Sequence, residues 1–213
     1  RSKGENGAAS GGLVLTNIDA TLEGSRVYGG DGAYLAGETE VEKKVTASNA
    51  LSVREGSVTA GNTVLHGGGA DVETGGKPTR FSRGIVLSKA RITGTHVTVL
   101  AGQGFGNSIG LYLIGDSSAA MNGSLFVAQT DRTWGIFATE TACSAKSFKG
   151  KSSFVNVVFA QPEVTATSAL FRAETDSGCS DTSLPSELKA MGVAVTDTVR
   201  VTKLPGSGAA DLL

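Results

Sequence analysis

The chain has 213 residues, a formal net charge of −1 and 39% hydrophobic residues, so it is long enough for one sizeable core and does not require a second domain. The near-neutral charge gives no electrostatic reason to expect nucleic acid as a partner, and no apolar stretch approaches the roughly 20 residues of a membrane-spanning helix. The 30 glycines and the 18% of charged residues compare with average values of roughly 7% and about 25%. This composition predicts short strands punctuated by turns.

We expect residues 1–10 to be a flexible N-terminal segment, and the sequence from residue 11 to contain a repeat marked by a short apolar triplet. The triplets begin at Leu13, Leu51, Ile85, Leu111, Ile136 and Ala169. The steps of 26 and 25 residues from Ile85 to Leu111 and from Leu111 to Ile136 set a basic unit of about 25 residues. The longer steps predict insertions at 30–44, 67–80 and 144–153. Self-similarity at a period of roughly 20–50 residues is typical of a solenoid, in which each repeat buries its apolar face on its neighbours. A β-sandwich also has short strands and regular turns, but it does not explain why the same pattern returns in the same order.

Segments such as 50–65 (ALSVREGSVTAGNTVL) and 85–100 (IVLSKARITGTHVTVL) resemble the right-handed parallel β-helix proteins. The passenger domains of bacterial autotransporters are the most similar, and the pectin-lyase-like enzymes share that fold. The resemblance covers roughly residues 11–175 and implies three short parallel sheets, extended loops on one side and secretion. We therefore expect an all-β, right-handed parallel β-helix over residues 11–180.

Residues 181–205 depart from the repeat and predict a C-terminal cap. Ser183 is a plausible helix N-cap, Pro185 follows in the first turn and Gly192 is a natural stop, which predicts one short helix over 185–191. The alternation of apolar and polar residues over 193–203 predicts a final strand, and residues 206–213 are expected to be a flexible tail.

The opposite end of the solenoid is expected to need a cover as well. Solenoids need both ends covered to remain soluble, and no comparable cap precedes Leu13. An upstream domain or a homo-oligomer is expected to cover this end. The sequence begins at Arg1 without a methionine or an apolar leader, so we expect a processed or excised fragment.

A polar strip is predicted just after the first strand of each repeat. The triplet alignment places equivalent positions at Asn17, Glu55, Lys89, Gly115 and Glu140. Parallel neighbours lie about 4.8 Å apart, so Glu55 and Lys89 are expected to pair, and an exposed pair contributes under about 1 kcal/mol. A solvated face is the favoured interpretation, and a binding strip containing Glu55, Lys89 and Glu140 is the alternative.

Aromatic residues are expected mainly inside the stack. For Trp134, packing over the core is favoured, while an exposed position would indicate sugar binding or an interface. The other aromatics expected to be core stacks or loop anchors are Phe105, Tyr112, Phe126, Phe137, Phe154, Phe159 and Phe171.

The sequence contains no catalytic or metal-binding signature. A glycosidase needs two carboxylates about 5–9.5 Å apart across a cleft, and the nearest approach to a lyase-type cluster is Asp116, Asp131 and Arg132. His66 and His96 lie in different repeats without the spacing of a zinc site, so no metal or cofactor is expected.

The two cysteines, Cys143 and Cys179, lie in turn-like sequence. They predict one disulfide and an oxidising compartment, and two unpaired thiols are the alternative.

We expect a bacterial protein that is extracellular or on the cell surface and is not an enzyme. Its role would be that of an adhesin, a stalk or a recognition module for a glycan or a host-surface protein. Two alternatives stay open. One is a polysaccharide lyase or hydrolase with a groove on the β-helix face, and the other is a subunit of a trimeric fibre similar to a tailspike.

Overall fold

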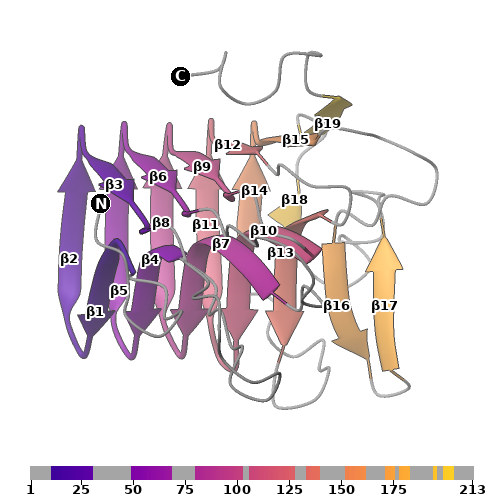
Figure 1. The fold of residues 1–213 in the computed structure, drawn as a ribbon, viewed down its shortest axis with the longest axis horizontal. Coiled ribbons are helices and arrows are strands. Elements are labelled where there is room, and N and C mark those ends of the chain that lie inside the picture. Colours follow the sequence, from indigo (N-terminus) through magenta and orange to yellow (C-terminus); the bar gives the residue numbers. More distant parts are fainter. Residues whose placement is uncertain are drawn as a thin grey trace, which may run out of the picture.

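The computed structural model describes residues 11–30, 49–68, 80–102, 106–127, 133–139, 152–161, 171–175, 178–182, 194–195 and 199–203. Every regular element in these ranges is a β-strand, and the strands form three sheets, here named A, B and C (Figure 1). Neighbouring strands are parallel throughout, except for β16 and β17. This arrangement is consistent with a parallel β solenoid. Within the described ranges no helix is long and apolar enough to cross a membrane.

Each repeat contributes one strand to each sheet, in the order A, B, C. Sheet A contains, in spatial order, β1 (Leu13–Thr16), β4 (Asn49–Arg54), β7 (Arg80–Ser88), β10 (Gly106–Ile114), β13 (Thr133–Thr139), β16 (Phe171–Thr175) and β17 (Gly178–Thr182). Sheet B contains β2 (Asp19–Glu23), β5 (Ser57–Gly61), β8 (Arg91–Thr95), β11 (Ser118–Asn122), β14 (Ser153–Val155) and β18 (Ala194–Val195). Sheet C contains β3 (Arg26–Tyr28), β6 (Val64–His66), β9 (Thr98–Leu100), β12 (Leu125–Val127), β15 (Val158–Gln161) and β19 (Arg200–Lys203).

The apolar triplets lie in register along sheet A. The triplet alignment is confirmed for the first five, because successive repeats pair Leu13, Leu51, Ile85, Leu111 and Ile136 in that order. The sixth triplet was predicted two residues too early, since Ile136 pairs with Phe171. The apolar run 169–171 hides this register because the equivalent strand continues into the polar Arg172.

The core lies between the three sheets and is built from ladders of alternating residues. In sheet A the first and third residues of a triplet, such as Leu111 and Leu113, are fully buried. Sheet C contributes Phe126, which stacks on Phe159 with ring centroids 5.2 Å apart and planes 23° apart. Phe154 of sheet B meets Phe159 edge-on at 6.4 Å. The core position predicted for these three phenylalanines is confirmed.

Two corners in each repeat are made by a residue in the left-handed conformation. The corners between sheets A and B have φ from 50° to 61° and those between sheets B and C have φ from 45° to 56°. The A–B corner residues are Asn17, Glu55, Lys89 and Gly115, and the B–C corner residues are Gly24, Asn62, His96, Gly123 and Asn156. This conformation is costly for residues other than glycine, and asparagine tolerates it best among them. Backbone hydrogen bonds to the next repeat, such as Glu55 N to Ser88 O at 3.0 Å, hold the corners in place.

A small residue directly before each triplet lets sheet A pass close to sheet C. A Cβ atom added at Gly84 would overlap Cγ1 of Val99 and would lie 2.8 Å from the carbonyl oxygen of Gly110. Val99 belongs to β9 and is fully buried. The contact between β7 and β9 therefore requires glycine at position 84.

The C-terminal region extends two of the sheets. The prediction of one strand over 193–203 is wrong, because this segment provides the two strands β18 and β19. Val195 pairs with Phe154 in sheet B and Val201 pairs with Phe159 in sheet C. The helix expected over 185–191, the segment 1–10 and the tail 206–213 lie outside the described residues.

Candidate functional site

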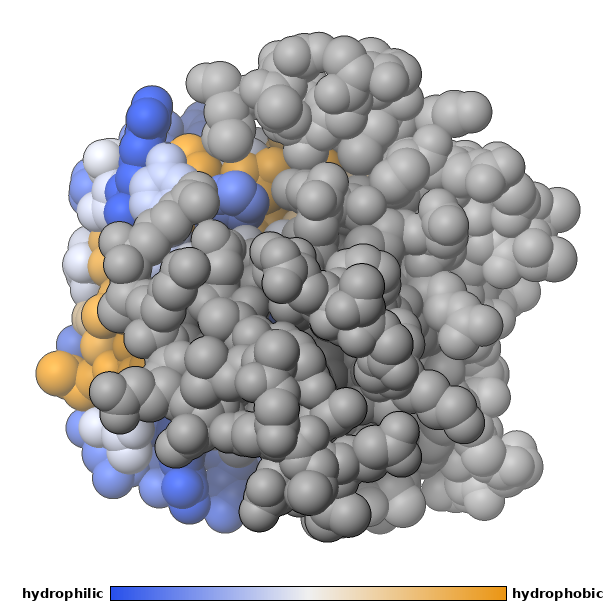
Figure 2. All heavy atoms as spheres, in the orientation of Figure 1, coloured by the Kyte–Doolittle hydropathy of each residue, from blue (hydrophilic) through white to orange (hydrophobic). Residues whose placement is uncertain are grey.

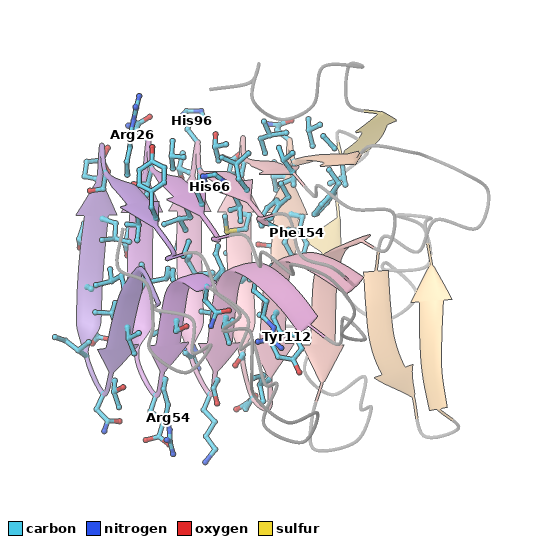
Figure 3. The ribbon with its side chains drawn as sticks, in the orientation of Figure 1. Arg26, Arg54, His66, His96, Tyr112 and Phe154 are labelled. Atoms are coloured by element: carbon cyan, nitrogen blue, oxygen red, sulfur yellow. The ribbon has the colours of Figure 1, made fainter. Side chains whose placement is uncertain are left out.

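The predicted polar strip is the A–B corner of successive repeats, and its ion pair is present. Oε1 of Glu55 lies 3.9 Å from Nζ of Lys89 on the next repeat and 3.8 Å from Nε of Arg54. The side chains of Arg54 and Lys89 are about 70% exposed, and Figure 3 shows Arg54 projecting from the lower edge of the stack. Water and salt therefore screen these contacts. Glu140 lies outside the described residues.

Two further carboxylates bind groups on the neighbouring repeat. Oδ1 of Asp19 accepts hydrogen bonds from the backbone N of Ser57 at 2.9 Å and from its Oγ at 2.5 Å. Oε1 of Glu23 accepts a hydrogen bond from Nδ2 of Asn62 at 2.7 Å. Both carboxylates thus connect the first repeat to the second on the outside of the stack.

The residues of the lyase alternative are not brought together in the described part of the chain. Asp116 is exposed at an A–B corner. Three residues separate β10 from β11 there, whereas two separate β7 from β8. Asp131 and Arg132 lie outside the described residues. No group of three or more His, Cys, Asp or Glu side chains that could hold a metal ion occurs among the residues described.

The two histidines lie on different parts of the stack. His66 is in sheet C, and its ring meets the ring of Tyr28 edge-on at 5.7 Å. His96 is a B–C corner residue. The predicted disulfide stays a prediction, because Cys143 lies outside the described residues and Cys179 is described only as part of the backbone of β17.

The outer face of sheet A carries an aromatic and cationic pair that the sequence analysis missed. Tyr112 was expected in the core, but the adjacent Leu111 and Leu113 occupy the core side and are fully buried. Figure 3 shows Tyr112 beside β10 and β13. The guanidinium carbon of Arg83 lies 4.7 Å from the centroid of the Tyr112 ring, which is a cation–π distance. Burial lowers the pKa of Arg83 and the interaction with Tyr112 opposes this shift, yet an arginine stays charged at neutral pH.

Polar and aromatic positions surround this pair on neighbouring strands. Asn49 of β4 pairs in register with Arg83, and its Nδ2 donates a hydrogen bond to Oγ of Ser52 at 3.1 Å. Oδ1 of Asn49 is buried and has no hydrogen-bond partner among the described residues. On the other side, β13 places Phe137 in register with Tyr112.

Trp134 joins the same region through the backbone register. It pairs with Ile109, whose other neighbour is Arg83. The sequence therefore pointed to the correct strand through its only tryptophan, but the neighbours of that residue required the register. A sequence signal was present, because Arg83 and Trp134 both stand two residues before the first residue of an apolar triplet.

Comparisons with protein-family models, with curated proteins and with solved structures found no match for this chain.

Proposed function

We propose that this chain is a right-handed parallel β-helix that is exported to a bacterial cell surface or beyond it. In this role it is a rigid recognition module for a glycan or a surface protein and performs no reaction. The proposal rests on one observation: Asp19, Glu23 and Glu55 each bind a donor on the next repeat. These carboxylates are used to align repeats, whereas an acid–base enzyme needs two of them facing a substrate.

The repeat explains how such a module keeps its surface in shape. Backbone hydrogen bonds join every corner of the described stack to the following repeat, and three sheets share one core. Side chains on the outer faces are consequently held at fixed positions by several neighbouring strands. A surface held in advance in its binding geometry loses little entropy when a partner binds.

The first repeat supports a further part of the proposal, namely that another polypeptide packs against this end. The large hydrophobic residues that are exposed among those described are Val14 (64%), Ile18 (50%) and Tyr28 (43%), all in or between β1 and β3. Figure 2 shows apolar surface at the same end of the stack. A second subunit or a preceding segment would bury this surface, and sedimentation velocity on the purified chain tests the subunit case.

The experiment for the main proposal measures binding and turnover on the same samples. Purified chain is mixed with hyaluronan, with dextran and with intact bacterial and animal cells, and co-sedimentation reports binding. Reducing ends and the ultraviolet absorbance of unsaturated uronides are followed in parallel. We expect binding to at least one surface without new products, and heat-unfolded chain should not bind. Product formation would show an enzyme, and a folded chain that binds none of these surfaces would contradict the recognition role.

A further inference from the structure

The three sheets differ in the charges that their strands carry. The five strands β1, β4, β7, β10 and β13 of sheet A contain Arg54, Arg80 and Arg83 and no acidic residue. The matching strands of sheet B, β2, β5, β8, β11 and β14, contain Asp19, Glu23 and Arg91. Although the chain as a whole is close to neutral, sheet A is cationic. Such a surface attracts an anionic partner.

The same strands of sheet A are also rich in aromatic residues. They contain Phe81, Tyr112, Trp134 and Phe137. Phe137 is the register partner of Tyr112, and Trp134 is separated from Arg83 only by Ile109. Aromatic residues combine a flat apolar area with specific geometry, and burial of an apolar ligand surface on them is favourable.

The described contacts give this region a directional donor and an acceptor. The guanidinium of Arg83 is planar and presents its donors in a fork that fits a carboxylate, and Tyr112 holds it at 4.7 Å. Because Arg83 is largely buried, a carboxylate that reaches it would interact in a medium of lower dielectric than water. Oδ1 of Asn49, which pairs in register with Arg83, is an acceptor for a hydroxyl group.

We propose that the outer face of sheet A around Arg83 and Tyr112 binds an acidic polysaccharide. The sugar carboxylate would meet the guanidinium of Arg83, a hydroxyl group would donate to Asn49, and the apolar face of a sugar ring would lie against the aromatic positions of β13. This inference rests on the proposed recognition function and names its ligand class and its site.

The test uses hyaluronan as the acidic probe and dextran as the neutral one, with titration calorimetry on the full chain at low and moderate salt. The substitutions are Tyr112→Ala and Arg83→Gln. The matched controls are Tyr28→Ala on sheet C and Arg91→Gln on sheet B, which remove the same groups from other sheets. Circular dichroism and Tm report folding. Arg83→Lys and Tyr112→Phe serve if either main variant unfolds, because Lys keeps the charge without the fork and Phe keeps the ring.

We expect hyaluronan binding to weaken at least about tenfold in both main variants, as loss of a charged hydrogen bond predicts, and about threefold or more in Arg83→Lys. The two controls should stay within about twofold of the unsubstituted chain. If that chain binds hyaluronan but the substitutions on sheet A act no more strongly than the controls, the site is wrong while recognition stands. Binding of dextran or cells without hyaluronan would overturn the acidic class, and binding of none of these probes would overturn the recognition function itself.

Discussion

Replacing Gly84 with alanine tests the packing of sheet A against sheet C. The added Cβ would overlap Cγ1 of Val99, which is fully buried, and would lie 2.8 Å from the carbonyl oxygen of Gly110. Neither neighbour has open space to move into, because one is a core side chain and the other belongs to the adjacent strand. The crowding must therefore shift the backbone of β7 or the side chain of Val99.

The size of the effect follows from two opposing contributions. Overpacking a well-packed core costs about 1–3 kcal/mol. Replacing a strand glycine with alanine returns about 0.5–1 kcal/mol, because the unfolded chain becomes less flexible. The free energy of unfolding should thus fall by about 1–2 kcal/mol, which lowers Tm by about 2–8 °C in a chain of this size.

The assay is urea unfolding of the single and double variants as a double-mutant cycle. Val99→Ala alone leaves a cavity and costs about 2 kcal/mol. In Gly84→Ala/Val99→Ala the added methyl enters that space, so the double variant should be at least about 1 kcal/mol more stable than the sum of the two losses predicts. Gly24→Ala is the control, because a Cβ at Gly24 meets nothing within 4 Å and its cost comes from φ of +54°. A Gly84→Ala variant as stable as the original chain, or additivity with Val99→Ala within about 0.5 kcal/mol, would refute the packing argument.

Three further substitutions have distinct expected outcomes in thermal and urea unfolding. Phe126→Ala should lower the free energy of unfolding by about 3–5 kcal/mol, because it removes a fully buried ring and its stack with Phe159; a loss below about 1.5 kcal/mol would contradict this core. Lys89→Gly should be neutral or stabilising by up to about 1 kcal/mol, since glycine relieves the left-handed conformation at φ 50°, whereas a loss larger than about 1 kcal/mol would show that the side chain matters more than the backbone. Glu55→Gln should change stability by less than about 1 kcal/mol, because its ion pairs are exposed; a larger, salt-sensitive loss would show that the corner ion pairs are a main support of the stack.

The repeat could be predicted from sequence because parallel stacking places equivalent residues of successive repeats side by side. The triplets at Leu13, Leu51, Ile85, Leu111 and Ile136 were aligned correctly for this reason. The sixth failed because its strand begins at Phe171, the last residue of the apolar run, and continues through Arg172. Apolar pattern alone does not define a strand whose outward residues are charged.

The corners and the candidate site were harder to predict. Glu55 and Lys89 were considered for their charges, but the structure shows that their shared property is a left-handed backbone, which sequence indicates only through the asparagine and glycine at equivalent positions. Tyr112 was assigned to the core because it lies inside an apolar triplet, although the middle residue of a half-buried strand faces outward. Its contact with Arg83 joins two adjacent strands, β7 and β10. No pattern along the chain reveals such a contact before the register is known.

The corners also determine where the chain tolerates change in length. In the first four repeats two or three residues join sheet A to sheet B and two join sheet B to sheet C, whereas 20, 13, 5 and 5 residues lead from sheet C to the next strand of sheet A. Length therefore varies at one edge of the stack while the cross-section of each repeat is kept. Foreign peptides grafted into 69–79 or 103–105 should be displayed without loss of the scaffold, and the spacing between two grafts would be set by the number of repeats that separate them.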